Sequence, residues 1–243
     1  MFKKLQSFFF RNKDTEPEAA YDRWATDYDD QPRNLMLQLD EQIFSGLLQD
    51  LDIKDLTVTD IGCGSGRHWK KIWDKGPKQL TGYDVSAEML LLLQKKFPGS
   101  TVYKINGNKL EHSPDESVQL IISTLTLAHI ENLPDALSEW NRVLQPGGHI
   151  IITDFHPLAL QKGAKRSFKH KDKMFTVKNF IHSIDEIQII SGQLQWQVVR
   201  LEERMIDENV KSWFDEQDAR AAFQSFKGTP VIYGLLLKKR DAD

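Results

Sequence analysis

The residues best suited to ligand chemistry form a glycine cluster at positions 58–66, which read Val-Thr-Asp-Ile-Gly-Cys-Gly-Ser-Gly. Glycine tolerates positive φ and lets a ligand approach the backbone beside the N-terminus of a following helix. The spacing therefore predicts a small cofactor lying across Gly62–Gly66. The dinucleotide fingerprint G-x-G-x-x-G requires glycine where this chain has Arg67, so the pattern does not favour a nicotinamide cofactor.

A carboxylate follows the glycine cluster about twenty residues later. Asp84 directly follows the segment Leu80–Tyr83, whose composition predicts a strand. At the end of the second strand of an open α/β sheet, a carboxylate is placed to accept hydrogen bonds from two ribose hydroxyls. The cluster and Asp84 together predict a cofactor that contains a nucleoside.

Histidine is the residue type that suits proton transfer near neutral pH. His156 follows the fifth predicted strand and His129 follows the fourth, so both are candidate catalytic residues at the carboxyl edge of the sheet. The alternative for each is structural, in a turn for His156 and at the start of a helix for His129. His182 is a further candidate, whereas we expect no catalytic role for His112 or His149.

Strands and helices alternate along most of the chain, which calls for parallel pairing with right-handed crossovers. The predicted fold class is α/β, with a Rossmann-like, doubly wound, seven-stranded and mostly parallel sheet whose last strand is antiparallel. We interpret Pro146-Gly147-Gly148 as a tight turn. The predicted strands are Leu56–Ile61, Leu80–Tyr83, Val102–Ile105, Val118–Ser123, His149–Thr153, Leu194–Leu201 and Val231–Lys238, and the predicted helices are Arg67–Trp73, Ala87–Phe97, Pro134–Leu144, Ser183–Ile190 and Phe214–Phe226.

Two further helices, Ala19–Asp29 and Asn34–Leu51, are predicted before the sheet and are interpreted as a cover. We therefore divide the chain into N-terminal cover helices at residues 1–50 and a Rossmann-like domain at residues 51–243, together one structural domain. Residues 155–180 form an insertion after the fifth strand. This insertion would lie at the carboxyl ends of the strands, where open α/β sheets bind ligands.

The insertion carries a basic stretch with little acidic counterweight. We expect this stretch to form part of a pocket for an acidic or phosphate-bearing acceptor, and the alternative is a solvated hairpin. Its basic residues are Lys162, Lys165, Arg166, Lys169, Lys171 and Lys173.

Composition restricts the partners and the compartment. The chain has 32 basic and 35 acidic residues and a net charge of -3, so no overall basic field would hold it on nucleic acid. Cys63 is the only cysteine and no zinc-site spacing is present, so we expect a cytoplasmic protein without a metal. No run is long enough to anchor the chain stably in a membrane. A face of Phe2, Leu5 and Phe9 beside basic residues suits weak membrane contact, with a cover helix or a partner contact as the alternative.

Four segments resemble, in order, the sequence motifs of class I S-adenosylmethionine-dependent methyltransferases. They are YDRWATDYD at residues 21–29, DIGCGSG at 60–66, GYD at 82–84 and LQPGGHIIITD at 144–154. The first resembles the opening of the methyltransferase type 11 branch that includes ubiquinone and menaquinone biosynthesis methyltransferases. The resemblance covers roughly Tyr21–Asp154 and implies S-adenosylmethionine as the cofactor.

The resemblance also implies roles for individual residues. The glycine-rich turn would face the methionine portion of the cofactor, and Asp84 would hold the ribose. Asn108 stands where the family has an aspartate that accepts from the adenine amine, and an amide oxygen can accept the same bond. For Met89, Tyr21 and Trp24 the alternative is a packing role. The implied cofactor contacts are Asp60, Gly62, Cys63, Gly64, Gly66, Asp84, Val85, Met89, Gly107, Asn108, Ser123, Thr124, Tyr21 and Trp24.

The expected function is methyl transfer to a small-molecule acceptor, with an anionic acceptor as one option. The acceptor itself, the atom methylated and the oligomeric state are not predicted. In-line attack on a sulfonium methyl depends on positioning within about 3 to 3.5 Å and on exclusion of water, so a dedicated base is optional. Two alternatives stay open: a noncatalytic S-adenosylmethionine-binding partner subunit and, less favoured, a nicotinamide-dependent oxidoreductase.

Overall fold

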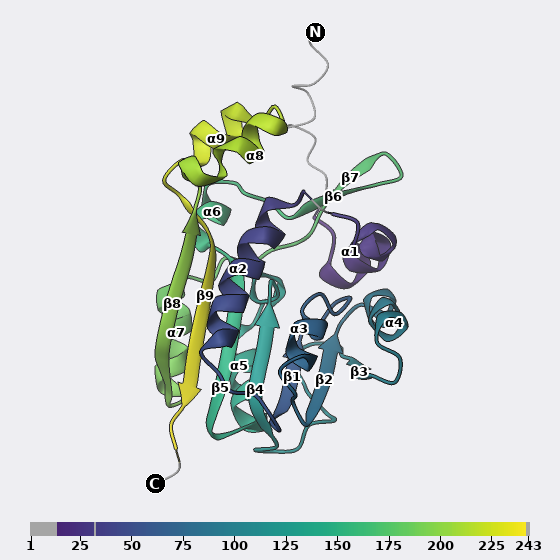
Figure 1. Cartoon of the computed structure of the whole chain (residues 1–243), viewed down its shortest axis with the longest axis vertical. Coiled ribbons are helices and arrows are strands. Elements are labelled where there is room, and N and C mark those ends of the chain that lie inside the picture. The colour runs from purple at the N-terminus through teal and green to yellow at the C-terminus, as the bar shows by residue number, and fades with distance from the viewer. Residues whose placement is uncertain (1–13, 32, 242–243) are drawn as a thin grey trace.

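The computed structural model describes residues 14–31 and 33–241, which fold into a layered α/β structure (Figure 1). Seven strands form one sheet in the order β3-β2-β1-β4-β5-β9-β8. Strand β9 runs antiparallel to both β5 and β8, whereas the pairs from β3 to β5 are parallel. The predicted fold class, with its antiparallel last strand, is confirmed. The strands are β1 (Thr57–Ile61), β2 (Gln79–Asp84), β3 (Thr101–Lys104), β4 (Val118–Thr124), β5 (Leu144–Phe155), β8 (Trp196–Met205) and β9 (Pro230–Lys239).

Helices cover both faces of this sheet, with α2, α3 and α4 packing on one face and α5 and α7 on the other (Figure 1). Several helices begin after an N-cap residue whose side chain accepts a backbone N–H of the first turn. These residues are Asn34 before α2, Ser86 before α4 and Asn132 before α5. The helices are α1 (Pro17–Trp24), α2 (Leu35–Gln49), α3 (Trp69–Trp73), α4 (Ala87–Lys96), α5 (Leu133–Val143), α6 (Pro157–Gln161), α7 (Ile184–Gln193), α8 (Lys211–Glu216) and α9 (Arg220–Phe226), with short 3-10 turns at Ala25–Asp27, Leu127–His129 and Glu208–Val210.

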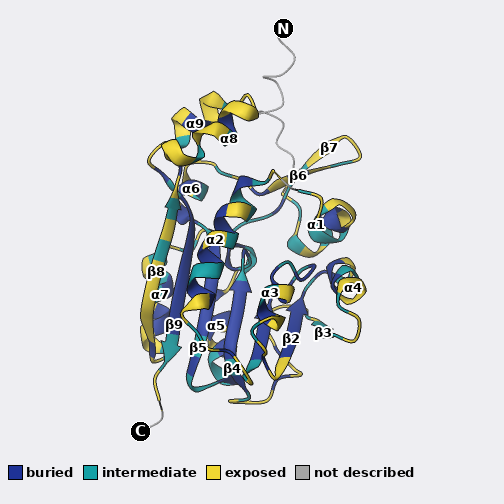
Figure 2. Ribbon diagram, in the orientation of Figure 1, coloured by how far each residue is buried: buried dark blue, intermediate teal, exposed yellow. Residues whose placement is uncertain are grey.

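The core follows the two-residue period of the strands. In β4, Leu120 and Ile122 belong to the apolar cluster under α2 and α3, while Ile121 belongs to the cluster under α5 and α7. In β9, Leu236 and Leu237 divide between the clusters in the same way. Figure 2 shows the central strands buried on both faces, which explains their nearly continuous apolar sequences.

Two local predictions are corrected by the structure. The predicted single helix Phe214–Phe226 is wrong because α8 and α9 are separate helices, and between them Asp218 has a φ of 53° that no helix continues through. The predicted tight turn at Pro146-Gly147-Gly148 lies inside β5, which starts at Leu144. There the ladder with β4 bulges, since Val118 pairs with Leu144 while Leu120 pairs with His149.

The carboxyl ends of β1, β2 and β4 lie under α1 and the hairpin of β6 (Ser167–His170) and β7 (Lys173–Thr176) (Figure 1). The segment before α1 joins the end of the insertion through a bridge between Thr15 and Val177. Of the two predicted cover helices, α1 lies at this end, whereas α2 packs on β5 and β9 within a helix layer. The domain boundaries stay a prediction, and the apolar face at Phe2, Leu5 and Phe9 lies outside the described residues.

Candidate active site

The turn after β1 brings the backbone close to the loop after β4. Gly62 and Gly64 have φ angles of 74° and 51°, in the left-handed region that favours glycine. A Cβ at Gly62 would lie 2.1 Å from Thr126 Oγ1, so only glycine fits there. A Cβ at Gly64 would meet no atom within 4 Å. The turn is therefore closed against the loop at Gly62 and faces open space at Gly64.

Asp84, at the end of β2, locks this turn. Its Oδ2 accepts the N–H of Gly64 at 2.8 Å, and its Oδ1 accepts the N–H of Ser86 at 2.8 Å. Burial raises the pKa of Asp84 from its ordinary value of 3.8 to about 6, against the opposing effect of these backbone bonds. Each oxygen keeps acceptor capacity for a further hydrogen bond.

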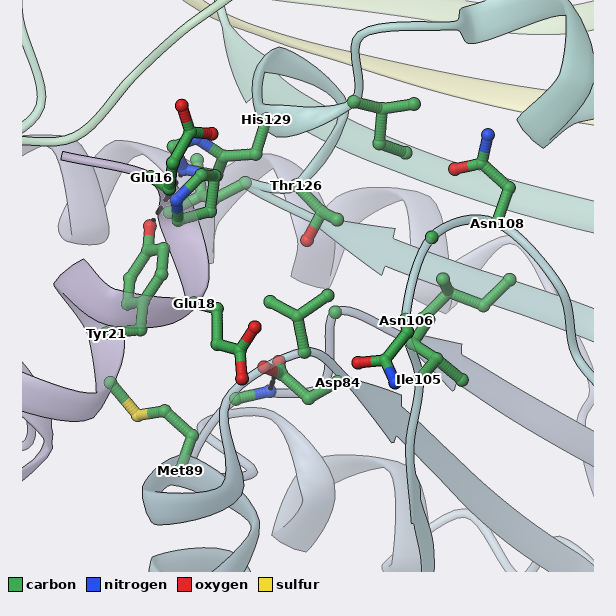
Figure 3. A pocket seen from close by; sticks show the side chains of 18 of the residues that line it. Glu16, Glu18, Tyr21, Asp84, Met89, Ile105, Asn106, Asn108, Thr126 and His129 are labelled. Atoms are coloured by element: carbon green, nitrogen blue, oxygen red, sulfur yellow. Dashed lines mark hydrogen bonds between the residues drawn. The ribbon is translucent and has the colours of Figure 1, made fainter. Parts of the chain in front are cut away.

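A cavity of about 550 Å³ adjoins the turn at the carboxyl ends of β1, β2 and β4 (Figure 3). Many residues predicted from sequence line it, namely Tyr21, Gly62, Gly64, Asp84, Val85, Met89, Gly107, Asn108, Thr124 and His129. Sequence reasoning missed other lining residues, among them Glu16, Glu18, Tyr28, Asn106, Leu125 and Thr126. A signal existed for Tyr28, which lies in the YDRWATDYD segment, and for Thr126, which follows the fourth strand.

Other predicted cofactor residues lie behind the lining and support it. Ser123 Oγ donates to the carbonyl of Ile61 at 2.9 Å and so ties β4 to β1. Trp24 is buried and stacks on Phe168 with ring centroids 4.6 Å apart. Direct cofactor contact stays a prediction for the whole group, which comprises Asp60, Cys63, Gly66, Ser123 and Trp24.

Asp60 is a second buried carboxylate below the turn. Its Oδ2 accepts from Trp69 Nε1 at 2.8 Å, while its Oδ1 has no hydrogen-bond partner within the described chain. Burial raises the pKa of Asp60 to about 6, and the bond from Trp69 opposes that rise. Two buried carboxyl groups with raised pKa values therefore lie beside the turn, and of the two only Asp84 lines the cavity.

The opposite end of the cavity is closed by a polar network. Arg166 Nη1 donates to the Tyr21 hydroxyl at 2.8 Å and to the Leu125 carbonyl at 2.6 Å, and it also contacts His129 Nε2. Tyr21 Oη and His129 Nε2 are 2.9 Å apart. Arg166 Nη2 donates to Asp154 Oδ1 at 3.2 Å. Side chains from α1, the loop after β4, β5 and the insertion thus meet at one guanidinium.

His129 lines the cavity as a neutral imidazole. Its Nδ1 lies 2.9 Å from the carbonyl of Lys178, which can only accept, so Nδ1 carries the proton and Nε2 faces Arg166 as an acceptor. Burial, and then the charge of Arg166, lower the pKa of His129 to about 3. Both nitrogens are engaged, so the structure does not support the predicted catalytic role as a proton acceptor.

His156 has a capping role and does not line the cavity. Its Nδ1 accepts the N–H of Leu158 at 3.1 Å at the start of α6, so Nε2 donates to Glu203 Oε1 at 2.7 Å. This geometry matches the turn role that the sequence left open and gives no support for catalysis. His182 Nε2 likewise bonds a backbone carbonyl, that of Ile130, at 2.7 Å.

The basic residues of the insertion do not form one surface. Arg166 is buried, whereas the five lysines of the basic stretch are exposed, and none of these six residues lines the cavity. The charged side chains of the described lining are the carboxylates of Glu16, Glu18, Asp84 and Glu131. The prediction that the basic stretch forms part of the acceptor pocket is therefore not supported.

Within residues 14–31 and 33–241, no group of three or more His, Cys, Asp or Glu side chains could hold a metal ion. No helix in those same ranges has the length and apolar character needed to cross a membrane. The expectations of no metal and no stable membrane anchor still rest on the sequence.

The chain is similar to known methyltransferases in sequence. Residues 59–152 match a family model described as a methyltransferase domain. The ubiquinone/menaquinone biosynthesis C-methyltransferase UbiE of Campylobacter jejuni is 32% identical over 143 residues, which are 55% of this chain and 57% of that protein. The malonyl-[acyl-carrier protein] O-methyltransferase of Hamiltonella defensa is 28% identical over 189 residues, which are 76% of this chain and 69% of that protein. For several curated relatives, the chain spans only about half of their length.

A solved structure of an S-adenosylmethionine dependent methyltransferase from Mesorhizobium loti has the same fold. It superposes with a TM-score of 0.63 at 18% identity, over 81% of this chain and 97% of that chain. The sheet order and this superposition show the Rossmann-like fold of class I methyltransferases. The domain match runs from within β1 to within β5, and together with this fold it supports a class I S-adenosylmethionine-dependent methyltransferase, which implies that cofactor.

Proposed function

We propose that this protein transfers the methyl group of S-adenosylmethionine to a small-molecule acceptor. The observation that carries the proposal is the position of Asp84. Its carboxylate lies on the cavity, fixed by two backbone N–H groups, beside the open backbone of Gly64. A nucleoside ribose needs a fixed acceptor of this kind next to a backbone that a ligand can approach.

The cavity fits the remaining parts of the cofactor. In Figure 3, Asn106 and Asn108 lie on one side of Asp84 and Tyr21 lies on the other. We assign the side of Asn108 to adenine, because its amide can pair with the base and a Cβ at Gly107 would meet nothing within 4 Å. The methionine portion then falls beside the glycine turn and Thr124. When bound, the cofactor supplies an electrophilic methyl group on a sulfonium.

The chain's own residues would act mainly by enclosing the reacting groups. Tyr21 and His129 close the wall opposite the adenine side and exclude water, which strengthens interactions inside the cavity. His129 holds its proton at Nδ1 and does not serve as a base. Glu16 and Glu18 are ion-paired with Lys178 and Lys104, but the described lining itself contains carboxylates and no lysine or arginine, which favours a neutral or cationic acceptor over an anionic one.

Calorimetry with S-adenosylhomocysteine and NAD tests cofactor choice. We expect micromolar binding of S-adenosylhomocysteine, about 7 to 8 kcal/mol, and much weaker binding of NAD. Binding of NAD without S-adenosylhomocysteine would favour the oxidoreductase alternative and reject the proposal.

A second experiment tests turnover. Incubating the protein with metabolite extracts and methyl-labelled S-adenosylmethionine should give a labelled product that identifies the acceptor and the methylated atom. Cofactor binding without a labelled product from any extract would favour the noncatalytic partner subunit. An anionic labelled product would contradict the inference from the cavity charges.

Two further proposals concern the domain organisation and the cellular compartment. We infer that the cover and the sheet form one structural domain, supported by the packing of α2 on β5 and β9 and by the bridge between Thr15 and Val177. The buried, unpaired Cys63 is compatible with a reducing compartment, and we propose the cytoplasm.

A further inference from the structure

Arg166 lies in the basic stretch of the insertion but points inward. Its exposed fraction is 6%, and its guanidinium ion-pairs with Asp154 and stacks over the Phe155 ring, 4.6 Å from the centroid. Asp154 also accepts the N–H groups of Ala128 and Phe155, both at 2.7 Å. The charge of Arg166 is therefore compensated inside the fold and is not available to an external anion.

The groups that Arg166 contacts are themselves the wall of the cavity. Tyr21, Leu125 and His129 line it, whereas Arg166 does not. Tyr21 is separated from Arg166 by 145 positions and His129 by 37 positions. The guanidinium is thus a common anchor for the cover, the loop after β4 and the insertion, one layer behind the cavity.

The loop after β4 needs such an anchor because its backbone is strained. Leu125 has a φ of 55°, in the left-handed region that a residue with a Cβ rarely adopts. Its N–H donates to the Thr153 carbonyl at 2.7 Å, and its carbonyl accepts from Arg166 at 2.6 Å. Both sides of the strained residue are held, and Arg166 supplies one of the two bonds.

The cover is held independently on its other side. Asp22, in α1, accepts from Ser86 Oγ at 2.6 Å, and Asp29 accepts from Ser65 Oγ at 2.6 Å. These bonds tie the cover to the cofactor side of the cavity, so losing the Arg166 contact would release only the Tyr21 side. A local change in the wall is then separable from unfolding of the cover.

We propose that Arg166 is a positioning residue that fixes the wall opposite the adenine side by holding Tyr21, Leu125 and His129 in one arrangement. Arginine suits this role because its planar fork presents several donors in fixed directions, whereas a lysine reaches fewer acceptors at once. The shape of the wall would then depend on the insertion through this side chain, in addition to the Lys178 carbonyl that His129 contacts. The naming of the ligand rests on the proposed function, but the wall's dependence on Arg166 does not.

Hydrogen exchange measured by mass spectrometry on the ligand-free full chain tests the proposal. Arg166→Met should speed exchange in residues 15–28 and 124–131, and Arg166→Lys should restore part of the protection. Lys165→Met, an exposed neighbour, is the matched control and should match the wild type. Unchanged exchange in both segments of folded Arg166→Met would overturn the proposal.

Arg166→Met leaves Asp154 buried without its cation, so the single variant risks misfolding. The double variant Arg166→Met with Asp154→Asn removes that charge and keeps the question answerable. It should recover thermal stability but bind S-adenosylhomocysteine about tenfold more weakly than the wild type, since the cofactor must then order a loose wall. Wild-type affinity in a stable double variant would reject the positioning role, whereas absence of binding by the wild type would reject the proposed function instead.

Discussion

The two ends of the cavity are built in different ways. At the nucleoside end, the Asp84 carboxylate bonds the Gly64 backbone, which lies 20 positions away, and the contact follows from two adjacent strands and one turn. At the opposite wall, Tyr21 and Arg166 are 145 positions apart and meet only after the whole fold has formed. One end is therefore local and backbone-built, whereas the other depends on side chains from distant segments.

The ends also differ in how they compensate charge. Asp154 in the wall has the Arg166 cation beside it, whereas Asp84 and Asp60 accept hydrogen bonds only from neutral donors. Burial raises the pKa of all three carboxyl groups, to about 6 for Asp84 and Asp60, and for Asp154 the charge of Arg166 opposes the rise. We therefore expect the wall to respond most to loss of a charge partner and the nucleoside end to respond most to pH.

The largest expected effect is that of Asp154→Ala on stability. It leaves Arg166 buried without a counter-charge, so the free energy of unfolding should fall by about 3 to 5 kcal/mol in urea denaturation. Lys70→Ala, which removes the exposed pair with Asp74, is the control and should change stability by no more than about 1 kcal/mol. If both variants lost the same small amount, the wall would not depend on its buried pair.

The next effect is the pH dependence of the nucleoside end. The pKa of Asp84 and that of Asp60 are raised by burial from 3.8 to about 6, so the folded state holds these protons more tightly than the unfolded state. Their contribution to stability is fully present below pH 3.8 and is lost as the pH rises through 6, by on the order of 3 kcal/mol for each group.

Asp84→Asn isolates one of these groups. The free energy of unfolding of this variant, relative to that of the wild type, should increase between pH 4 and pH 7. The pH-dependent contribution of Asp60 to stability is present in both proteins and cancels in the comparison. In the same window the wild type should bind S-adenosylhomocysteine more tightly as Asp84 ionises, since a charged acceptor bonds hydroxyls more strongly. Parallel stability curves for the two proteins would contradict the raised pKa of Asp84.

A smaller effect is expected for Asp84→Ala on cofactor affinity. Loss of charge-assisted bonds worth about 1.5 to 3 kcal/mol each, partly replaced by water, should weaken S-adenosylhomocysteine binding at least about tenfold in calorimetry. Glu88→Gln removes an exposed charge nearby on α4 and should bind normally. Normal affinity in a folded Asp84→Ala protein would remove Asp84 from the ribose site.

The sequence predicted the nucleoside end because its signals are local. The turn at Gly62–Gly66 and the carboxylate at Asp84 lie in order on neighbouring strands, and alternating strands and helices determine which edge they share. Strand β5 starts at Leu144, but the sequence predicts its start only at His149, because the bulge at Pro146-Gly147-Gly148 resembles a turn in sequence. Bulges of this kind depend on pairing with a neighbour, here β4.

The wall was not predicted because its partners meet only in three dimensions. Arg166 was grouped with the neighbouring lysines by charge, although a local signal existed. Arg166 and Phe168 are buried while Lys165, Ser167 and Lys169 are exposed, which is the two-residue period of a strand with one covered face. This two-residue period would have separated Arg166 from the exposed lysines, but it would not have identified Tyr21 and Asp154 as its partners.

The smallest predicted effect concerns His156, which lies outside both ends of the cavity. His156→Ala removes the side chain that caps α6 and the bond to Glu203, so stability should fall by about 1 kcal/mol. His156→Asn keeps a side-chain oxygen that can accept the N–H of Leu158 and should recover most of the loss. Both proteins should bind S-adenosylhomocysteine as the wild type does, because His156 does not line the cavity.

Comparison of these two variants separates a capping role from a catalytic one. A cap responds to whether the new side chain accepts a hydrogen bond, so urea denaturation should rank Asn above Ala while methyl transfer to the identified acceptor stays near normal in both. A catalytic histidine responds to loss of the imidazole, so both variants would lose turnover with stability and cofactor affinity intact. That second pattern would place His156 in acceptor chemistry and extend the reacting region beyond the wall that Arg166 holds.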